Sequence, residues 1–277
     1  MHKLNLENIN TRTDLAIELN ENDIKIEDID DIKVSRIVIS KKDEEKIGKK
    51  SGNYITIEFD DVIDFDSSKK IEKVLINELK KLLKKLKIKE DDKALIIGLG
   101  NEKSTPDALG PSVINNIIVT SYLFNNNIEV EKGFRCVSAI TPGVTGITGI
   151  ETYDIITSII NKIKPDFLIV IDALKASSLN RLNKTIQITD SGISPGSGIG
   201  NKRREISFET VKIPVIAIGV PTVVDTNTII YEKTKKKLND ENNYIVTEIN
   251  IDEIIQKLGL VIGISINNAL HKNVTHL

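Results

Sequence analysis

The sequence is poor in histidine, the side chain that most often acts as a catalytic acid or base. Its three histidines, His2, His271 and His276, all lie near the ends of a 277-residue chain. A Ser-His-Asp site, a Cys-His site or a histidine-rich zinc site would need one of those terminal residues. The histidine-free interior therefore favours chemistry that uses neither imidazole nor a metal.

Cysteine, tryptophan and long apolar runs are also scarce. Cys136 is the only cysteine, which excludes an internal disulfide and favours a reducing compartment. Tryptophan is absent and aromatics make up 4% of the residues, so the core must be aliphatic. The net charge of -2 gives no sign of nucleic-acid binding. Because no apolar run could span a bilayer and the N-terminus lacks a secretory pattern, we expect a cytoplasmic protein without membrane or nucleic-acid partners.

What the chain does contain is an alternation of strands and helices. The first ninety residues predict a β/α extension, with strands at 33–40 and 53–61 and a helix at 67–88 capped by Ser67 or Ser68. This alternation predicts an α/β fold, with a mostly parallel sheet covered by helices on both faces. In the expected core, residues 91–277, strands are predicted at 93–99, 134–140, 166–174, 184–189 and 213–220, and helices at 107–124, 151–163 and 251–271.

A glycine turn between the first core strand and its helix contains Asp107. Gly98 and Gly100 begin a dinucleotide fingerprint, but Lys103 stands where the third glycine belongs, and no Walker lysine follows. A phosphate would also meet the Asp107 carboxylate, so the phosphate interpretation fails on spacing and on charge. The simpler alternative is that Asp107 caps or begins the helix, as aspartate often does.

Asp172 favours a catalytic role for Asp107 over the capping role. It ends the apolar run "FLIVID", where burial raises the pKa of a carboxyl group that lacks compensating partners. Asp107 and Asp172 should meet at the carboxyl edge of the sheet, where open α/β sheets build their sites. Two close carboxyl groups can share a proton, one acting as base toward water and the other donating to a carbonyl oxygen. This chemistry hydrolyses amides without histidine, cysteine or metal.

Three glycine-rich segments, 141–151, 190–203 and 219–226, are expected to converge on the same edge. A single such loop is a flexible connection, but three together favour close backbone approach by an extended peptide. Asp190 and Asp225 are candidates for supporting positions. The candidate substrate-binding residues are Gly143, Gly146, Ser194, Gly196, Ser197 and Gly198, in which the serines are more typical of turns than of nucleophiles.

These residues resemble the germination protease family of spore-forming bacteria along nearly the whole chain. The matching segments include "RTDLAIE" (12–18), "GKKSGNYITIE" (48–58), "GLGNEKSTPDALGP" (98–111), "ITPGVTGITGIET" (140–152) and "IPVIAIGVPTVVD" (213–225). Between 231 and 243 this chain departs from longer family members, which carry more residues there. That difference bears on peripheral packing or assembly contacts, not on the acid pair.

The resemblance implies an aspartic-type endopeptidase with Asp107 and Asp172 as its acids and no cofactor. Its substrates would be the small acid-soluble spore proteins, degraded during germination in the forespore and spore core. It implies a phosphorylase/hydrolase-like fold similar to that of the hydrogenase maturation endopeptidases. It also implies a homotetrameric zymogen that removes its own N-terminal segment.

The same resemblance gives a function to "TDLAIE" (13–18). The simpler interpretation is a capped start of structure led by Thr13 or Asp14. By family analogy the segment mimics the sequence cut in the substrates, and the self-cleaved bond is Asp14–Leu15. Residues 1–14 would then be a propeptide, and residues 15–277 a single peptidase domain whose part 15–90 packs on the core.

Two alternatives stay open. One is a metal-dependent processing endopeptidase of the hydrogenase maturation type, in which carboxylates alone would hold a hard cation such as Mg²⁺ or Ca²⁺. The other is a non-catalytic module that binds a nucleotide or a peptide in its glycine loops.

Overall fold

The computed structural model describes residues 13–19, 24–126, 128–196, 203–235 and 244–272. Within these residues one nine-stranded sheet runs in the order β1-β2-β3-β7-β8-β6-β4-β5, and β9 pairs with the end of β8. The strands are β1 (Lys25–Ile29), β2 (Ile32–Ile39), β3 (Gly52–Glu58), β4 (Ala94–Gly98), β5 (Val137–Ile140), β6 (Phe167–Ala176), β7 (Thr185–Thr189), β8 (Val215–Asp225) and β9 (Ile245–Val246).

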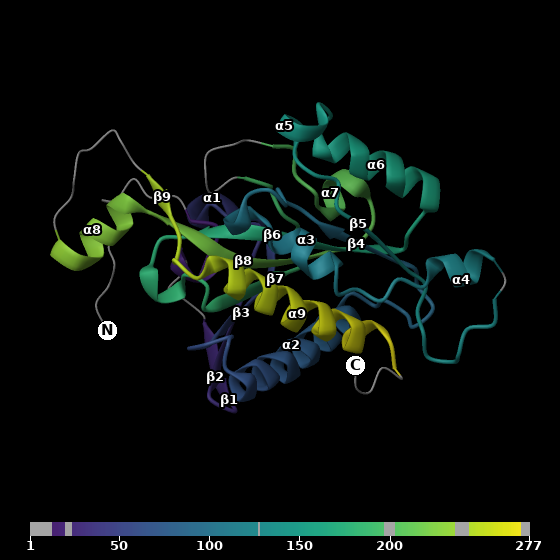
Figure 1. Cartoon of the computed structure of the whole chain (residues 1–277), viewed down its shortest axis with the longest axis horizontal. Coiled ribbons are helices and arrows are strands. Elements are labelled where there is room, and N and C mark those ends of the chain that lie inside the picture. The colour runs from purple at the N-terminus through teal and green to yellow at the C-terminus, as the bar shows by residue number, and fades with distance from the viewer. Residues whose placement is uncertain (1–12, 20–23, 127, 197–202, 236–243, 273–277) are drawn as a thin grey trace.

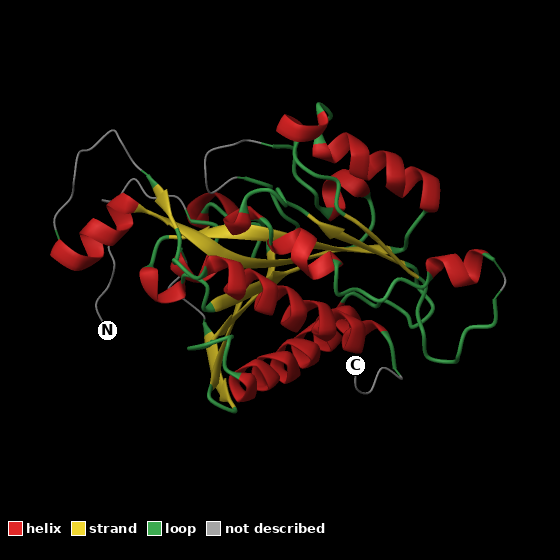
Figure 2. Cartoon of the chain, viewed as in Figure 1, coloured by secondary structure: helices red, strands yellow, loops and turns green. Residues whose placement is uncertain are grey.

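Helices cover both faces of this sheet (Figure 2). The long helices α2 and α9 lie side by side on one face together with α3, and α6 lies on the other face (Figure 1). The α-helices are α1 (Glu44–Ile47), α2 (Phe65–Lys85), α3 (Leu109–Ile114), α4 (Ser121–Asn125), α5 (Thr145–Thr148), α6 (Thr152–Ile163), α7 (Phe208–Val211), α8 (Thr226–Thr234) and α9 (Ile251–Leu270). Short 3-10 helices are η2 (Ala16–Glu18), η3 (Thr105–Asp107) and η4 (Leu179–Arg181).

The α/β class and the two helical layers are confirmed, and the sheet is mixed. Strands β8, β6, β4 and β5 are parallel neighbours, as expected for the core. Strand β7 runs antiparallel to β8 and joins the antiparallel strands β1–β3 to the core. Only residues 177–184 separate β6 from β7, and this connection is too short for the crossover that parallel strands need. The parallel part is therefore confined to four strands.

The core is aliphatic, as the composition predicts. Ile, Leu and Val side chains of β4, β6 and β8 pack on one side against α2, α3 and α9 and on the other against α6. The sheet is thus buried on both faces at its centre, which explains why its strands read as continuous apolar runs. No helix in the described part of the chain is long and apolar enough to cross a membrane.

The helix predicted over residues 107–124 is wrong as a single element. The chain forms η3, then α3, and becomes helical again only at α4. Between α3 and α4, the backbone amide of Ile118 donates to Asn267 Oδ1 of α9 at 3.0 Å, and that of Thr120 donates to the Val137 carbonyl at 3.0 Å. These contacts to α9 and β5 replace helical bonds in a stretch of β-branched residues, which are weak helix formers.

The start of α2 also differs from the prediction. Asp64, not Ser67 or Ser68, is the N-cap, and its Oδ1 accepts a hydrogen bond from the Ser67 amide at 2.8 Å. Asp64→Ala is expected to lower the free energy of unfolding by about 1 kcal/mol, since a helical amide loses its partner. Urea unfolding monitored by circular dichroism measures the change, with the exposed Asp60→Ala as control. Equal stability of the two variants would contradict the capping role.

Candidate active site

Asp172 lies near the carboxyl end of β6, in the parallel part of the sheet. It pairs in register with Gly219 of β8, and Gly219 pairs with Gln187 of β7, so the three residues lie in line across neighbouring strands. A Cβ atom at Gly219 would come within 2.4 Å of the Leu174 side chain, so any larger residue there would force Leu174 to move. Asp172 is 5% exposed. Burial raises its pKa well above the ordinary carboxyl value, and the nearby carboxylates of Asp107 and Asp14 add to the shift.

Asp107 comes from the loop after β4 and is the last residue of η3. Ala108, not Asp107, is the N-cap of α3, so the capping interpretation is wrong. The turn requires glycine because Gly100 has φ +113°, and a Cβ there would lie 1.9 Å from the Asp107 carbonyl oxygen. Thr222 Oγ1 of β8 fixes η3 by donating to the Pro106 carbonyl at 2.6 Å. Burial raises the pKa of Asp107, partly opposed by a hydrogen bond from the Asn101 backbone.

One cavity of about 310 Å³ is lined by both Asp107 and Asp172. Asp14 and Arg203 line it as well. The positive charge of Arg203 lowers the pKa of both carboxyl groups, but burial is the stronger influence on each. A neighbouring cavity of about 450 Å³ shares Asp14 and Asp172 with the first. Asp14 therefore stands where the two cavities meet, beside the most strongly perturbed carboxyl group.

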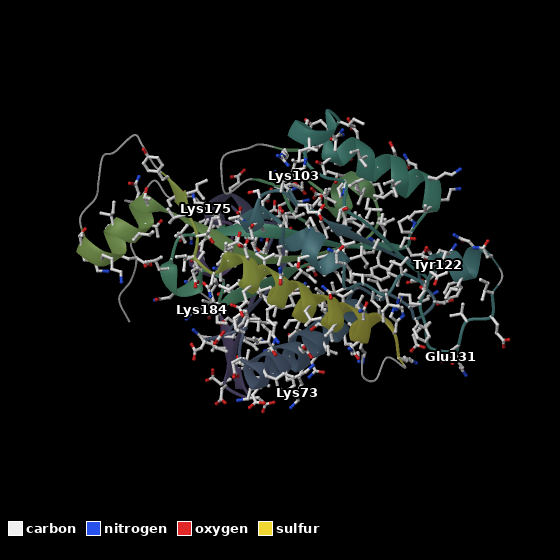
Figure 3. All side chains as sticks on the ribbon, in the orientation of Figure 1. Lys73, Lys103, Tyr122, Glu131, Lys175 and Lys184 are labelled. Atoms are coloured by element: carbon white, nitrogen blue, oxygen red, sulfur yellow. The ribbon has the colours of Figure 1, made fainter. Side chains whose placement is uncertain are left out.

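The N-terminal segment is bound to the end of β6 through Asp14. The Asp14 amide donates to the Lys175 carbonyl at 2.9 Å, and the Lys175 amide donates to Asp14 Oδ2 at 3.0 Å. Lys175 lies toward the end of the sheet from which β9 extends (Figure 3). One of these bonds uses the Asp14 backbone and the other its carboxylate, so both the main chain and the acidic side chain of Asp14 hold the segment in place.

The carbonyl oxygen of Asp14 has two side-chain donors. Lys49 Nζ lies 3.1 Å from it and Gln187 Nε2 lies 3.2 Å from it. Gln187 also accepts from the Ala16 amide through Oε1 at 2.7 Å, so one side-chain amide spans the Asp14–Leu15 bond. The carbonyl of this bond is thereby fixed in position next to the acid-lined cavity.

The residues after Asp14 are held by their side chains. Leu15 and Ala16 are both 0% exposed. Leu15 packs in an apolar cluster with Leu174 and Val224, and Ala16 packs in a second cluster under β2 and β3. Glu18 accepts hydrogen bonds from the Ser177 amide and hydroxyl, both at 2.8 Å. The segment therefore fits a groove that accepts a large apolar residue, a small residue and an acid in that order.

The other predicted site residues are only partly brought together. Gly143 and Gly196 line the cavity that holds the acids, and Ser194 lines its neighbour. Gly146 is exposed and lines neither, while Ser197 and Gly198 lie outside the described residues. The segment 219–226 is not a loop, because β8 continues through it to Asp225.

The two supporting acids have structural partners. Asp190 accepts from the backbone amide of Asn53 at 2.7 Å and from its side chain at 2.5 Å, which ties the end of β7 to β3, and it lines neither cavity. Asp225 is buried and forms an ion pair with Lys175 Nζ at 2.5 Å. Because the Lys175 backbone binds Asp14, Asp225 is linked to the bound segment through one residue.

Histidine and cysteine lie away from these cavities in the described part of the chain. His271 is buried beside Phe134, and its Nδ1 accepts from the Arg135 amide at 3.1 Å. Cys136 precedes β5, is half-buried rather than fully buried, and has a pKa raised by desolvation. Among the described residues, no three His, Cys, Asp or Glu side chains are grouped closely enough to hold a metal ion.

The sequence did not predict three residues of this site: Lys49 and Gln187, which bind the Asp14 carbonyl, and Arg203, which lines the cavity. The sequence does mark Gln187 as unusual, because it is the one amide side chain in the apolar strand "TIQIT" (185–189). Lys49 is one of several lysines in the turn "KKDEEKIGKKSG" (41–52), and nothing local distinguishes it from its neighbours. Its position depends on tertiary contacts, because Ile47 of α1 and Ile17 of the bound segment pack against the same apolar cluster.

Together, the fold and the site define a class of α/β protein that holds a peptide segment beside one buried and one half-buried carboxyl group, at the end of the parallel part of a mixed sheet. The chain matches the family described as "Germination protease" over residues 1–239, and it belongs to that family. It is 48% identical over 243 residues to the germination protease of Priestia megaterium (strain ATCC 12872 / QMB1551), a match that covers 80% of this chain and 66% of that protein.

A second relative, the germination protease of Geobacillus sp. (strain WCH70), is 48% identical over 246 residues, covering 80% of this chain and 66% of that protein. The chain thus spans about two thirds of the length of these curated relatives. Among solved structures, it is similar to the [NiFe] hydrogenase maturation protease HycI from Thermococcus kodakarensis KOD1. The identity is 16% and the TM-score 0.38, with 70% of this chain and 98% of that chain covered.

Proposed function

We propose that this chain is an endopeptidase that begins the degradation of small acid-soluble spore proteins during germination, acting in the forespore and spore core. Membership of the germination protease family supports this function. The observation that carries the proposal is the position of the Asp14–Leu15 bond, with Asp14 lining the same cavity as Asp107 and Asp172.

The two aspartates would take different roles, one as acid and one as base, because their surroundings differ. Burial raises the pKa of Asp172 more strongly than that of Asp107, so we assign the proton to Asp172 and the role of base toward the attacking water to Asp107. Water adds to the peptide carbonyl carbon, the C–N bond breaks, and the departing nitrogen receives a proton. Two carboxyl groups in one desolvated cavity supply both the base and the acid.

The uncut chain would be a zymogen. Asp14 occupies the place that a substrate residue needs, and a cut after Asp14 would detach it from the rest of the chain. A tethered segment has a high effective concentration, so it excludes other peptides until it is cut. The proposal includes assembly of the precursor as a homotetramer, the arrangement implied by the family resemblance.

The testing experiment uses the chain beginning at Leu15, incubated with an acidic spore-coat protein, with the cut mapped by mass spectrometry. We expect cleavage after an acidic residue and before an apolar residue followed by alanine. EDTA and iodoacetamide are expected to leave the rate unchanged, because carboxyl groups perform the chemistry and the raised pKa of Cys136 disfavours its thiolate.

The same experiment separates the proposed function from the two alternatives. Loss of cleavage in EDTA, restored by one particular cation, would support the metal-dependent endopeptidase. Nucleotide binding without any peptide cleavage would support the non-catalytic module and overturn the proposed function.

A further inference from the structure

We propose that Lys49 and Gln187 are catalytic residues that form an oxyanion site for the peptide carbonyl. This inference rests on the proposed peptidase function and adds a third chemical task to the two acids. Its basis is the pair of donors on the Asp14 carbonyl oxygen, Lys49 Nζ at 3.1 Å and Gln187 Nε2 at 3.2 Å. An oxyanion site needs donors at about 3 Å from the position that the charged oxygen will take, and both donors already lie near that distance from the carbonyl oxygen that would become it.

Both donors are held in place before any reaction. Gln187 is 6% exposed on β7, and because its Oε1 accepts from the Ala16 amide, its Nε2 must face the Asp14 carbonyl. Lys49 follows Gly48, the left-handed C-cap of α1, and its Nζ also donates to the Thr13 carbonyl at 3.2 Å. The Ser51 amide, bonded to Glu44 Oε1 at 2.8 Å, closes the turn that carries Lys49. A preorganised donor pair costs no rearrangement when charge develops.

The surroundings strengthen the effect of the charge on Lys49. Burial lowers the pKa of Lys49, and the carboxylates of Asp14 and Glu18 oppose that shift. The same loss of water that lowers the pKa reduces screening between the ammonium group and a nearby anion. An alkoxide at the Asp14 carbonyl oxygen would therefore gain more from Lys49 than a neutral carbonyl does.

Water oxygen bonds to the Asp14 carbonyl carbon and gives a proton to Asp107, and the carbonyl π electrons move to the oxygen, which Lys49 and Gln187 hold as an anion. The anion then re-forms the carbonyl, the C–N bond breaks, and the Leu15 nitrogen takes the proton from Asp172. Because Lys49 and Gln187 already stabilise the charge on the oxygen, we assign the Asp172 proton to the leaving nitrogen.

The decisive variants change one donor at a time. Lys49→Met removes the charge but keeps the length of the side chain, and Lys49→Arg retains a cation. Gln187→Glu keeps an oxygen for the Ala16 amide but removes the N–H donors. The control is Lys46→Met, an exposed lysine of α1 in the same turn.

With the processed chain and a spore-coat protein, Lys49→Met is expected to lower kcat about 10²–10³-fold while KM changes less than about threefold. Gln187→Glu is expected to lower kcat about tenfold or more, and Lys49→Arg should recover part of the loss. The rate of the Lys46→Met control should equal that of the wild type. Circular dichroism establishes that each variant is folded.

A raised KM with wild-type kcat for Lys49→Met would show that Lys49 only binds the peptide, and would overturn the inference. Wild-type kcat for Gln187→Glu would do the same if Lys49→Met fails to fold. Absence of cleavage by the wild-type chain would instead overturn the proposed function, so the two failures are distinguishable.

Discussion

Asp107→Asn and Asp172→Asn are each expected to lower peptide cleavage by about 10²–10⁴-fold, the usual contribution of a general acid or base. An amide at 107 cannot accept the proton of water, and an amide at 172 cannot supply a proton to the departing nitrogen. Both side chains line one cavity, so neither loss has a nearby substitute. Turnover of a spore-coat protein by the processed chain measures the effect. The exposed Asp154→Asn on α6 is the matched control.

The Asp172→Asn variant should also keep its stability. Between the ordinary carboxyl pKa and the raised pKa of Asp172, the folded chain binds more protons than the unfolded chain, so the free energy of unfolding falls as pH rises. Asp172→Asn has no carboxyl group to ionise at this position, so its free energy of unfolding does not fall in this way as pH rises. The variant should therefore be at least as stable as the wild type at neutral pH. Urea unfolding at mildly acidic and neutral pH measures the slope. Near wild-type turnover in either active-site variant would contradict the acid pair, and a destabilised Asp172→Asn would contradict its raised pKa.

The full-length chain is expected to cut itself between Asp14 and Leu15, so that the product begins at Leu15. The bond is already placed, since its carbonyl is bound by Lys49 and Gln187 and Leu15 is completely buried. Mass spectrometry of the purified chain over time measures the cut. Leu15→Asp should block it, because a charge would enter the apolar cluster that includes Leu174.

Mildly acidic pH should accelerate this cut. Asp14 adds a negative charge beside Asp172 and contributes to raising its pKa, so a lower pH increases the fraction with a protonated Asp172. The rate should fall again at more acidic pH as Asp107, the base, becomes protonated. The full-length Asp107→Asn chain is the control and should give no product. A mature end at another residue, or normal processing of the control, would contradict self-cleavage at this bond.

The sequence alone determined the α/β class, the aliphatic core and the two aspartates worth testing. These follow from local patterns. A continuous apolar strand must be buried on both faces, and a carboxyl group at the end of such a strand loses hydration, which marks it as a candidate for catalysis. The family resemblance also drew attention to "TDLAIE" (13–18). None of these inferences needs a contact between distant residues.

The tertiary structure decided what surrounds the acids. Register across β6, β8 and β7 aligns Asp172 with Gln187, and packing of the α1 turn brings Lys49 to a carbonyl 35 residues away in sequence. Contacts with α9 and β5 also broke the predicted helix after Ile114, and the hydrogen bond from Thr222 to the Pro106 carbonyl holds η3, on which Asp107 lies. Periodicity and propensity report only neighbours along the chain, whereas strand register and loop position are fixed by contacts between segments far apart in sequence.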